Sequence, residues 1–483
     1  MKVLGISALS HDAAVAVIDD KEILFAAHSE RYSRDKNDPY LNQEILDEAL
    51  SYGIPDVIAY YEKPYLKKAR QLYAGQYNEV FQTKNLFSNY IAHFNLPVKK
   101  IKYVDHHYSH AAGGYFTSPF DEACIVCIDA IGEWKTLSIW EARGDKIKMV
   151  ESKSYPNSLG LFYSAMTQAI GLKPLEDEYI LMGMAGWGKP IFKNKFETEY
   201  FDRDYVLNLK KNFHQGIDPS ELPVGSVMDI ASSVQAVTEE IIEDIMFYAE
   251  HNTKMNNLVY TGGVALNCLA NRHLPKYFDN IWIMPNPGDS GSALGAAAAI
   301  NGRLNWKSPY LGTNIEGDYP VEPVLKELLN GNIVGVANGR AEFGPRAFGN
   351  RSLLADPRGK DIKDRVNDIK HRQKFRPFSP SILEEYAEDF FEMPVEKTPY
   401  MQFVAKCKFP EQYPAIVHVD GTSRVETVNK KEKPGYWNLI NEFYKATGCP
   451  MLLNTSLNIK GEPLVNNERD AKAFQIEHNI KVY

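Results

Sequence analysis

The sequence predicts an α/β fold in which two copies of one lobe form the N-terminal part and a further domain follows. The chain has 483 residues, which is too long for one ordinary hydrophobic core, so two or three domains are expected. A three-strand pattern occurs twice, in residues 3–27 and in residues 123–151. Segments of helical periodicity come after the copies, and this combination is typical of duplicated α/β lobes.

Each copy begins with an apolar strand that ends at an Asp-containing turn. His11 and Asp12 stand in the first of these turns, and Asp129 stands in the second. Two further short strands follow in each copy and are joined by tight turns. Because a duplication brings equivalent turns to equivalent positions, we expect Asp12 and Asp129 to face a shared cleft.

A strand-to-helix junction follows the second copy. Residues 232–251 carry apolar residues at helical spacing, which predicts an amphipathic helix whose apolar stripe belongs to the core. Residues 258–260 then form a buried strand that opens into Gly262 and Gly263. Glycines at such a junction let the backbone approach a ligand, and the following helix N-terminus favours anions or a nucleotide; a short turn would use the same residues.

Two histidines and two aspartates form a candidate metal site. His106 and His110 are four residues apart, so on a helix their imidazoles project from the same face. Asp129 follows a strand, and Asp289 opens an Ala/Gly-rich helix, where its side chain is either an N-cap or a ligand. Two imidazoles with two carboxylates suit Fe, Mn or Zn better than Ca or Mg. His107, three residues from His110, stays the alternative first ligand.

Cations and hydroxyls gather in Gly- and Pro-rich segments of the C-terminal third. Guanidinium groups bind phosphate bidentately, hydroxyls and turn N–H groups fill its other acceptor sites, and glycines permit close approach. The segment Gly344-Pro-Arg-Ala-Phe-Gly-Asn-Arg351 therefore favours a phosphate site, although any single arginine is more often solvated or paired with a carboxylate. The sequence contains no Gly-x-x-x-x-Gly-Lys-Ser/Thr loop, which argues against an ordinary P-loop NTPase. The residues concerned are Arg340, Arg346, Arg351, Lys374, Arg376, Arg424, Ser352, Ser379, Thr422, Thr455 and Ser456.

Composition narrows the class and the location. Hydrophobic residues make up 44% of the chain and charged residues 24%, as in a soluble globular protein, and no segment approaches the roughly 20 apolar residues of a membrane span. The N-terminus runs straight into a strand and carries no signal peptide, and five cysteines at irregular positions argue for a reducing compartment. We therefore expect a cytoplasmic protein. The net charge of -8 gives no footprint for bulk nucleic-acid binding.

Ordered motifs through nearly the whole chain resemble those of the NodU/TobZ family of carbamoyltransferases. The motifs include Ser10-His-Asp-Ala-Ala14, Ser29-Glu-Arg-Tyr-Ser-Arg34, Asp105-His-His-Tyr-Ser-His-Ala111, Gly132-Glu-Trp134, Thr261-Gly-Gly-Val-Ala-Leu-Asn267, Pro287-Gly-Asp-Ser-Gly291, Gly344-Pro-Arg-Ala-Phe-Gly-Asn-Arg351, Phe375-Arg-Pro-Phe-Ser-Pro380, His418-Val-Asp-Gly-Thr-Ser-Arg424 and Leu452-Leu-Asn-Thr-Ser456. The resemblance implies two lobes of the actin/hexokinase/Hsp70 (ASKHA) type over residues 1–317 and a YrdC-like α/β domain over residues 318–483.

The resemblance also implies a reaction. The C-terminal domain would form a carbamoyl-adenylate from ATP and carbamoyl phosphate, and an acceptor hydroxyl in the N-terminal cleft would attack the carbamoyl carbon with AMP as the leaving group. The expected activity is thus that of an ATP-dependent O-carbamoyltransferase. Fe(II) or another divalent transition metal is the implied cofactor, and Mg²⁺ is expected with the ATP.

Matched by motif, the implied site residues fall into three sets. His106, His110, Asp129 and Asp289 would hold the metal. Asp12, His11 and Lys36 would form the catalytic set, with Asp12 as the base at the acceptor. The nucleotide and carbamoyl phosphate would be bound by Gly262, Gly263, Asn267, Arg346, Arg351, Lys374, Arg376, Ser379, Arg424, Asn454 and Ser456.

Other activities and partners stay open at this point. An ATPase or small-molecule kinase of the same fold would bind Mg²⁺ and ATP at the Asp turns and would not need carbamoyl phosphate; an inactive binding protein is a third reading. The negative net charge favours a small acceptor, such as a sugar, a nucleoside or an antibiotic-like natural product, over a nucleic acid. We expect acceptor contacts in residues 60–100 and 195–225, no membrane partner, and leave a homodimer open as the assembly.

Overall fold

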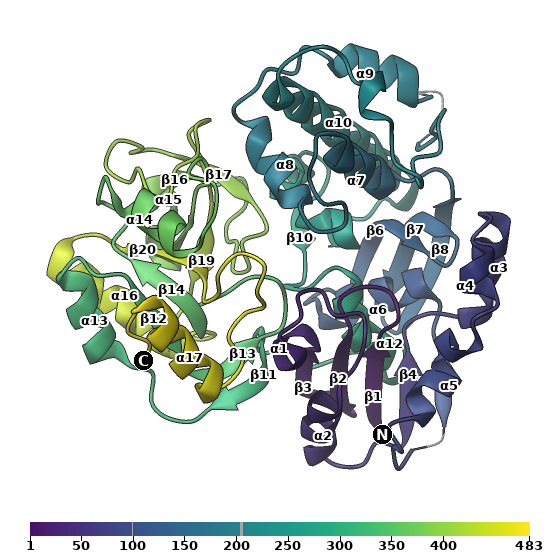
Figure 1. Ribbon diagram of the computed structural model, residues 1–483, viewed down its shortest axis with the longest axis horizontal. Coiled ribbons are helices and arrows are strands. Elements are labelled where there is room, and N and C mark those ends of the chain that lie inside the picture. Colours follow the sequence, from purple (N-terminus) through teal and green to yellow (C-terminus); the bar gives the residue numbers. More distant parts are fainter. Residues whose placement is uncertain (99, 203–205) are drawn as a thin grey trace. The chain divides into compact units, whose positions relative to one another are not determined.

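Two five-stranded sheets with the same strand order lie within the residues that the computed structural model describes, which are residues 1–98, 100–202 and 206–483 (Figure 1). The order β3-β2-β1-β4-β5 of the first sheet is repeated as β8-β7-β6-β9-β10 in the second. In both sheets the strands after the initial three-strand pattern pair in parallel. The prediction of two copies of one α/β lobe is therefore confirmed.

The strands of the first copy are β1 (Lys2–Ser7), β2 (Ala14–Asp19), β3 (Glu22–His28), β4 (Val57–Tyr60) and β5 (Ile101–Tyr103). Those of the second are β6 (Glu122–Gly132), β7 (Lys135–Arg143), β8 (Lys146–Ser154), β9 (Asn257–Thr261) and β10 (Asn280–Trp282). The central strand β6 is an unbroken apolar run because it is covered on both faces. Cys124 and Cys127 are fully buried there, as expected for structural thiols.

Contacts divide the chain into two units. Unit 1 consists of residues 1–9, 16–22 and 53–305, and unit 2 of residues 10–15, 23–52 and 306–483. The first copy of the lobe is thus shared between the units, and the turn with His11 and Asp12 belongs to unit 2. The expected domain boundary at 317/318 stays a prediction.

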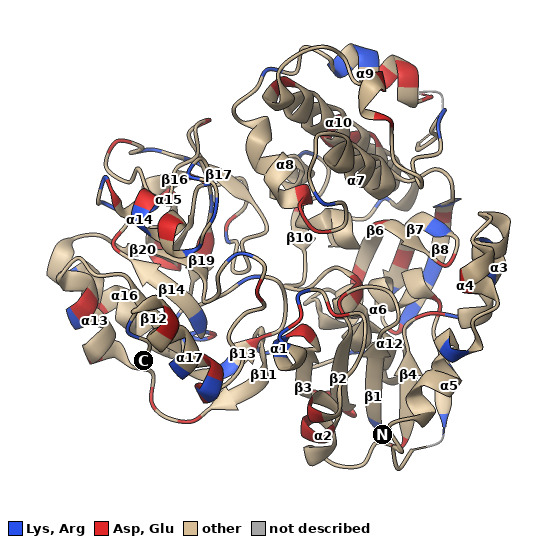
Figure 2. Ribbon diagram, viewed as in Figure 1, with Lys and Arg blue, Asp and Glu red and all other residues tan. Residues whose placement is uncertain are grey.

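The helices of unit 1 surround its sheets (Figure 1). They are α3 (Pro64–Tyr73), α4 (Tyr77–Val80), α5 (Phe87–Ala92), α6 (His106–Thr117), α7 (Leu159–Ala169), α8 (Glu178–Ala185), α9 (Lys193–Tyr200), α10 (Val227–Thr253), α11 (Cys268–Asn271) and α12 (Ser292–Asn301). Helix α10 contains the predicted residues 232–251 and begins earlier, where the Ser226 side chain accepts a hydrogen bond from Met228 N. Charges of both signs mix on the surface helices; on α9, Lys193 lies 3.5 Å from Glu197 (Figure 2).

Unit 2 is built on a sheet of order β12-β14-β20-β15-β19. Its strands are β11 (Tyr310–Ile315), β12 (Val334–Ala337), β13 (Gly339–Glu342), β14 (Arg351–Ala355), β15 (Ser379–Leu383), β16 (Phe391–Glu392), β17 (Val404–Cys407), β18 (Thr422–Arg424), β19 (Glu426–Val428) and β20 (Met451–Ser456). Its helices are α1 (Glu30–Ser33), α2 (Gln43–Ser51), α13 (Val321–Leu329), α14 (Ile362–Ile369), α15 (Ala387–Phe390), α16 (Pro434–Thr447) and α17 (Glu468–His478).

Two arginines tie α1 into unit 2. The buried guanidinium of Arg31 donates to the carbonyl oxygens of Glu342 and of Gly344, the latter at 2.8 Å. Arg34 donates to the carbonyl of Leu464 at 2.6 Å and to that of Pro463 at 3.0 Å. These contacts explain why an N-terminal segment belongs to the same unit as the C-terminal third.

Among the residues described, no helix combines the length and apolar composition that crossing a membrane requires.

Helices α6 and α12 approach each other closely because glycines face one another. A Cβ on Gly295 of α12 would lie 2.0 Å from the carbonyl oxygen of Ser109 on α6, and one on Gly113 would lie 3.0 Å from Gly295 Cα. On the neighbouring strand, a Cβ on Gly5 would lie 1.9 Å from the carbonyl oxygen of Ala293. The backbones therefore fix the position of α6, which carries the candidate histidines.

This packing predicts that Gly295→Ala destabilises the protein by about 1–3 kcal/mol, because the added methyl group meets backbone that cannot move aside. Gly183→Ala on α8 is the matched control, since no atom lies within 4 Å of the added Cβ. It should stabilise the protein by up to about 1 kcal/mol through helix propensity. Urea unfolding of both variants measures the difference, and equal effects would contradict the proposed contact.

Candidate functional site

Four side chains predicted to bind metal come together in unit 1. One nitrogen or carboxylate oxygen from each of His106, His110, Asp129 and Asp289 lies within 4.8 Å of the others. His106 Nε2 is 3.3 Å from Asp129 Oδ2 and 3.4 Å from Asp289 Oδ1, and His110 Nε2 is 3.3 Å from Asp289 Oδ1. The imidazoles are almost completely buried, and the two carboxylates are 10% exposed. We call these four residues the His/Asp cluster.

Hydrogen bonds orient the cluster from outside. His110 Nδ1 lies 3.1 Å from the carbonyl oxygen of Pro287, which can only accept, so Nδ1 carries the proton and Nε2 offers its lone pair to the cluster. Asp129 Oδ1 accepts from Gly263 N at 3.2 Å, which leaves Oδ2 facing the histidines. Two oriented imidazoles and two carboxylates in a buried position fit a divalent transition metal.

Local sequence features place the two helical ligands. Asp105 caps α6 by accepting from Tyr108 N at 3.1 Å, and Lys135 holds the Asp105 carboxylate at 2.7 Å. Gly132 follows in β6, where a Cβ would lie 2.0 Å from His106 Cδ2. A side chain at position 132 would therefore push His106 out of the cluster. This explains sterically why the Gly132-Glu-Trp134 motif begins with glycine.

The two adjacent histidines have opposite environments. Burial would lower the pKa of His106, but Asp289 and Asp129 raise it well above its ordinary value. Burial, together with His106 and His110, lowers the pKa of His107 to about 3. His107 points elsewhere, since its Nδ1 lies 2.7 Å from Ser138 Oγ. The geometry thus favours His106 over the alternative His107 as the partner of His110.

The predicted glycine junction lies beside the cluster. Gly262 has a φ of 88°, and a Cβ there would lie 2.2 Å from the carbonyl oxygen of Ile128, so glycine is required. Gly263 supports Asp129 through the hydrogen bond given above. Asn267 has a structural part: it exchanges two 3.0 Å hydrogen bonds with Gln235 and caps α11 through Ala270 N. Its amide therefore has a structural part within unit 1, and its nucleotide-binding role stays a prediction.

The predicted catalytic residues His11, Asp12 and Lys36 lie together in unit 2, whereas the His/Asp cluster lies in unit 1. His11 Nδ1 is 3.6 Å from Asp12 Oδ2. Burial would raise the pKa of Asp12, but His11, His28 and Lys36 lower it, so the carboxylate is ionised at neutral pH.

Lys36 is engaged by a carboxylate. Its ammonium lies 2.8 Å and 3.1 Å from the two oxygens of buried Glu30, which also accepts from Asn37 N. Asn37 in turn accepts from Asp12 N at 3.4 Å through its carbonyl. Lys36 therefore supports the Asp12 turn, and its catalytic role stays a prediction. The sequence analysis did not single out Glu30, although it stands inside the Ser29-Glu-Arg motif.

Arg351 serves the fold of unit 2. It is fully buried, and its Nε, Nη1 and Nη2 atoms all donate to backbone carbonyls, among them Asn466 at 3.0 Å, Asn338 at 3.0 Å and Thr313 at 3.0 Å. With its donors used in this way, Arg351 joins strands and loops of unit 2, and its phosphate-binding role stays a prediction.

The other polar residues of this set partly gather at one end of the main sheet of unit 2. Ser379 on β15 pairs with Asn454 on β20, and Arg424 Nε donates to Ser379 Oγ at 3.2 Å. Buried Asn454 donates to the carbonyl of Ala347, next to Arg346, at 3.0 Å. Ser456 lies at the end of β20, and Nζ of the buried Lys370 donates to its Oγ at 3.2 Å. Lys370 was not predicted, and no spacing signal marks it.

Lys374 and Arg376 lie in the segment between α14 and β15. Lys374 is exposed and 3.5 Å from Asp368, a surface pair that contributes little to stability. Arg376 and Arg346 are half-buried. The phosphate-binding role of these residues stays a prediction.

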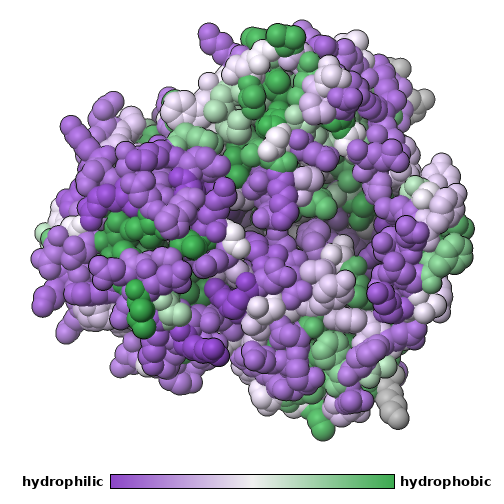
Figure 3. Space-filling view, in the orientation of Figure 1, coloured by the Kyte–Doolittle hydropathy of each residue, from purple (hydrophilic) through white to green (hydrophobic). Residues whose placement is uncertain are grey.

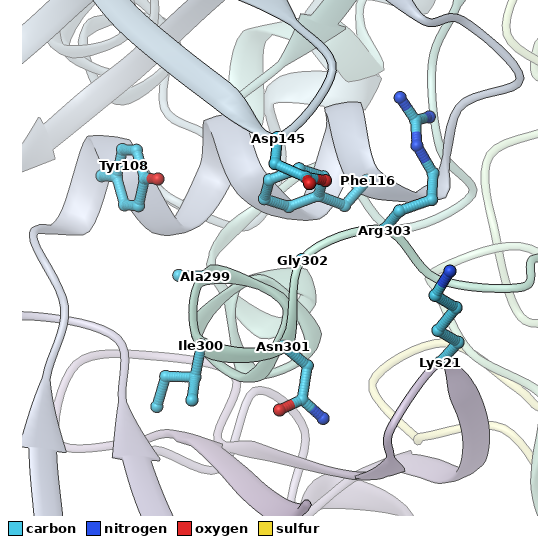
Figure 4. Close-up of a pocket in the computed structure, with 9 residues that line it drawn as sticks. All are labelled: Lys21, Tyr108, Phe116, Asp145, Ala299, Ile300, Asn301, Gly302 and Arg303. Carbon is cyan, nitrogen blue, oxygen red and sulfur yellow. The ribbon is translucent and has the colours of Figure 1, made fainter.

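A separate cavity of about 360 Å³ lies at the far end of α12 (Figure 4). Its lining includes Lys21, Phe116, Asp145 and Arg303, and none of its lining residues belongs to the predicted sets. Helix α12 has 10 residues, so this end is roughly 15 Å along the helix from Asp289. Arg303 is occupied there by the carbonyl oxygens of Ser118, at 2.8 Å, and Phe120.

Comparisons with known proteins give one consistent result. Two family models match the chain: carbamoyltransferase N-terminus over residues 2–298 and carbamoyltransferase C-terminus over residues 325–483. An uncharacterized protein of Synechocystis is 33% identical, over 97% of this chain and 93% of its own. Nodulation protein NolNO of Sinorhizobium fredii is 32% identical, over 95% and 76%. The 3′-hydroxymethylcephem-O-carbamoyltransferase of Amycolatopsis lactamdurans is 27% identical, over 95% and 94%.

The cluster geometry predicts one transition-metal ion per chain that is lost in the double variant His106→Ala, His110→Ala, because half of the donors are removed. Elemental analysis of the purified variants measures the occupancy. His107→Ala is the matched control on the same helix and should keep the ion. Full occupancy in the double variant, or loss of the ion in His107→Ala alone, would reject the His/Asp cluster as the binding site.

Proposed function

The chain belongs to the carbamoyltransferase family, and from this premise we propose that it is an ATP-dependent O-carbamoyltransferase acting on a hydroxyl of a small molecule. Water would cleave carbamoyl phosphate to carbamate and phosphate, the carbamate oxygen would displace pyrophosphate from ATP to give carbamoyl-adenylate, and the acceptor hydroxyl would then displace AMP. The His/Asp cluster is the observation that carries the proposal, because it brings four groups that could hold a cation together in the region matched by the carbamoyltransferase N-terminus. The cephem-carbamoylating relative supports a small-molecule acceptor.

We assign the His/Asp cluster to Fe(II) or another divalent transition metal. Bound there, the cation would supply positive charge for the oxygen of the carbamoyl group. The protein's own part is to hold the ligands: Pro287 and Gly263 orient His110 and Asp129, and the α6–α12 contact fixes the helix. A rigid, water-poor site strengthens such electrostatic stabilisation.

Asp12 is proposed as the base that accepts the proton of the acceptor hydroxyl. Its lowered pKa keeps it ionised, and the ion pair of Lys36 with Glu30 holds the neighbouring loop. His11, whose Nδ1 lies 3.6 Å from the carboxylate, can accept the proton from Asp12 and so become positively charged.

The adenylation step is proposed for unit 2. Arg346, Arg376 and Arg424 would neutralise the phosphates, and the hydroxyls of Ser379 and Ser456 would donate to the remaining oxygens. The link from Asn454 to Ala347 supports this assignment, since it joins the arginine-bearing loop to the strands that carry the serines.

This assignment predicts different consequences for two arginines of one motif. Arg346→Ala should lower carbamoyl-phosphate-dependent pyrophosphate release about 30- to 1,000-fold, equal to about 2–4 kcal/mol of transition-state stabilisation, with a small change in melting temperature. Arg351→Ala should lose about 3 kcal/mol or more of folding stability, because it leaves several buried carbonyls without a donor. Pyrophosphate assays and thermal melts test both. Unchanged pyrophosphate release in well-folded Arg346→Ala would remove that residue from the site.

The two-step reaction predicts that damage to the transfer step leaves adenylation intact. Asp289→Ala and Asp12→Ala should retain carbamoyl-phosphate-dependent pyrophosphate release while losing carbamoylated product, scored as a mass increase on sugar, nucleoside or cephem acceptors. Asp47→Ala, which removes an exposed carboxylate of α2, is the control and should retain both.

The same variants distinguish the proposed carbamoyltransferase from the kinase or ATPase alternative. In such an enzyme the Asp turns would hold Mg²⁺ and ATP, so Asp289→Ala and Asp12→Ala would abolish all nucleotide turnover. Loss of both activities in variants with normal melting curves would therefore favour that alternative. Turnover that does not depend on carbamoyl phosphate would do the same.

A further inference from the structure

Arg70, on helix α3, is a buried arginine for which the described residues provide no hydrogen bond or ion pair. The residue is 6% exposed. Among the residues that the structure describes, its Nε atom has no hydrogen-bond partner, and no ion pair involves its guanidinium. Burial lowers the pKa of Arg70, which reflects the cost of holding the charge there. Buried charges are normally paired, so this one is exceptional for a residue that serves the fold alone.

One acidic group, Glu62, acts on Arg70 without pairing with it. Glu62 lies close enough to raise the pKa of Arg70, but it forms no ion pair with the guanidinium, and its Oε1 is held by Lys67 at 2.8 Å and by the hydroxyl of Tyr60 at 3.2 Å. The contrast with Arg31 and Arg351 is informative, because both of these buried arginines donate to backbone carbonyls. Arg70 has no such role, which leaves its planar donors for a molecule outside the chain.

A group of aromatic rings begins one helical turn from Arg70. Tyr73, one helical turn beyond Arg70, has its ring centroid 5.5 Å from that of Trp134 and 6.3 Å from that of Tyr155. Tyr155 in turn lies 5.6 Å from His214, whose pKa is lowered by burial and by Arg70. Tyr73 is 72% exposed, and apolar surface lies over α3 and α4 at the right edge of the space-filling view (Figure 3). Such rings offer flat faces to a cyclic ligand.

The Arg70 region is continuous with the His/Asp cluster of the same unit. Tyr61, just before α3, packs its ring 5.1 Å from that of His106. Lys63 N donates to Glu133 at 2.5 Å, beside the glycine that packs against His106. From Pro64 to Arg70 the helix advances by about 9 Å, which is the scale of a sugar or nucleoside. Arg70 and His214 also fall in the two segments expected to contact the acceptor.

We propose that Arg70 binds an anionic group, a carboxylate or a phosphate, of the carbamoyl acceptor, whose ring lies against Tyr73, Trp134 and Tyr155. The inference rests on the proposed function for its assignment to the acceptor. The guanidinium would donate two parallel hydrogen bonds to the anion, which would neutralise the buried charge. The acceptor is accordingly an acidic, ring-containing molecule with a hydroxyl group.

The test uses the full chain with Arg70→Gln, Arg70→Lys and, as a control with the same loss of charge as Arg70→Gln, Arg143→Gln. Arg143 is 61% exposed and pairs with Glu122 at the opposite end of the β6–β7 pair from Trp134. The probes are benzoate, phenyl phosphate and uncharged benzyl alcohol, titrated by calorimetry and by thermal melt. The two anions distinguish a carboxylate from a phosphate ligand.

We expect Arg70→Gln to bind the preferred anion about tenfold more weakly or worse, and Arg70→Lys to retain part of the binding. Arg143→Gln should match the wild type, and benzyl alcohol should bind all variants alike. Without ligand, Arg70→Gln should melt at the same or a higher temperature than the wild type, because an unpaired buried charge is removed. A purely structural arginine would not produce that result.

Three results would overturn the proposal. They are a lower melting temperature of ligand-free Arg70→Gln, equal anion binding by that variant and the wild type, and no saturable binding of either anion to the wild type. Pyrophosphate release by the wild-type chain tests the proposed function separately and does not enter these titrations. A failed Arg70 site and a failed carbamoyl-transfer assignment would therefore be told apart.

Discussion

The contact between the backbones of α6 and α12 is the constraint on which the His/Asp cluster depends. Gly113 and Gly295 let the two helices approach until a single methyl group would no longer fit. One helix carries both histidines, and Asp289 stands immediately before the other. Rotation of a side chain can move its ligand atom only a short distance. The distance between the helices therefore decides whether four donors can meet, and this distance is set by residues that themselves carry no chemistry.

Buried charge is handled differently at three places in the molecule. In the His/Asp cluster, carboxylates and imidazoles compensate one another: the carboxylates raise the pKa of His106, and the histidines lower the pKa of Asp129. In unit 2, Arg31 and Arg351 are neutralised by carbonyl dipoles and act as cross-links of the fold. Arg70 has neither kind of partner among the described residues. The same residue type thus serves structure in two cases and, by our inference, recognition in the third.

The sequence was sufficient for the periodic and local features. The three-strand repeat predicted two copies of one lobe, and the spacing of His106 and His110, with Asp129 after a strand and Asp289 before a helix, predicted a cluster of these four side chains. It was not sufficient for the partners of Arg351, Lys36 and Asn267, which are backbone carbonyls, a neighbouring carboxylate and the amide of Gln235. Such partners leave no spacing pattern, because a long polar side chain can be satisfied by almost any oxygen within reach. Periodicity also could not predict that the first lobe is shared between two units. This sharing depends on contacts between residues more than 300 positions apart in the sequence, such as that of Arg31 with Gly344.

That sharing has a consequence for biosynthesis. Residues 10–52 emerge from the ribosome early, but the carbonyls that receive Arg31 and Arg34 belong to residues 342–344 and 463–464, which are translated about 300 and 430 residues later. The N-terminal segment therefore cannot make all of these contacts until residue 464 has left the ribosome. A nascent chain arrested near residue 305 would lack all four of these acceptors.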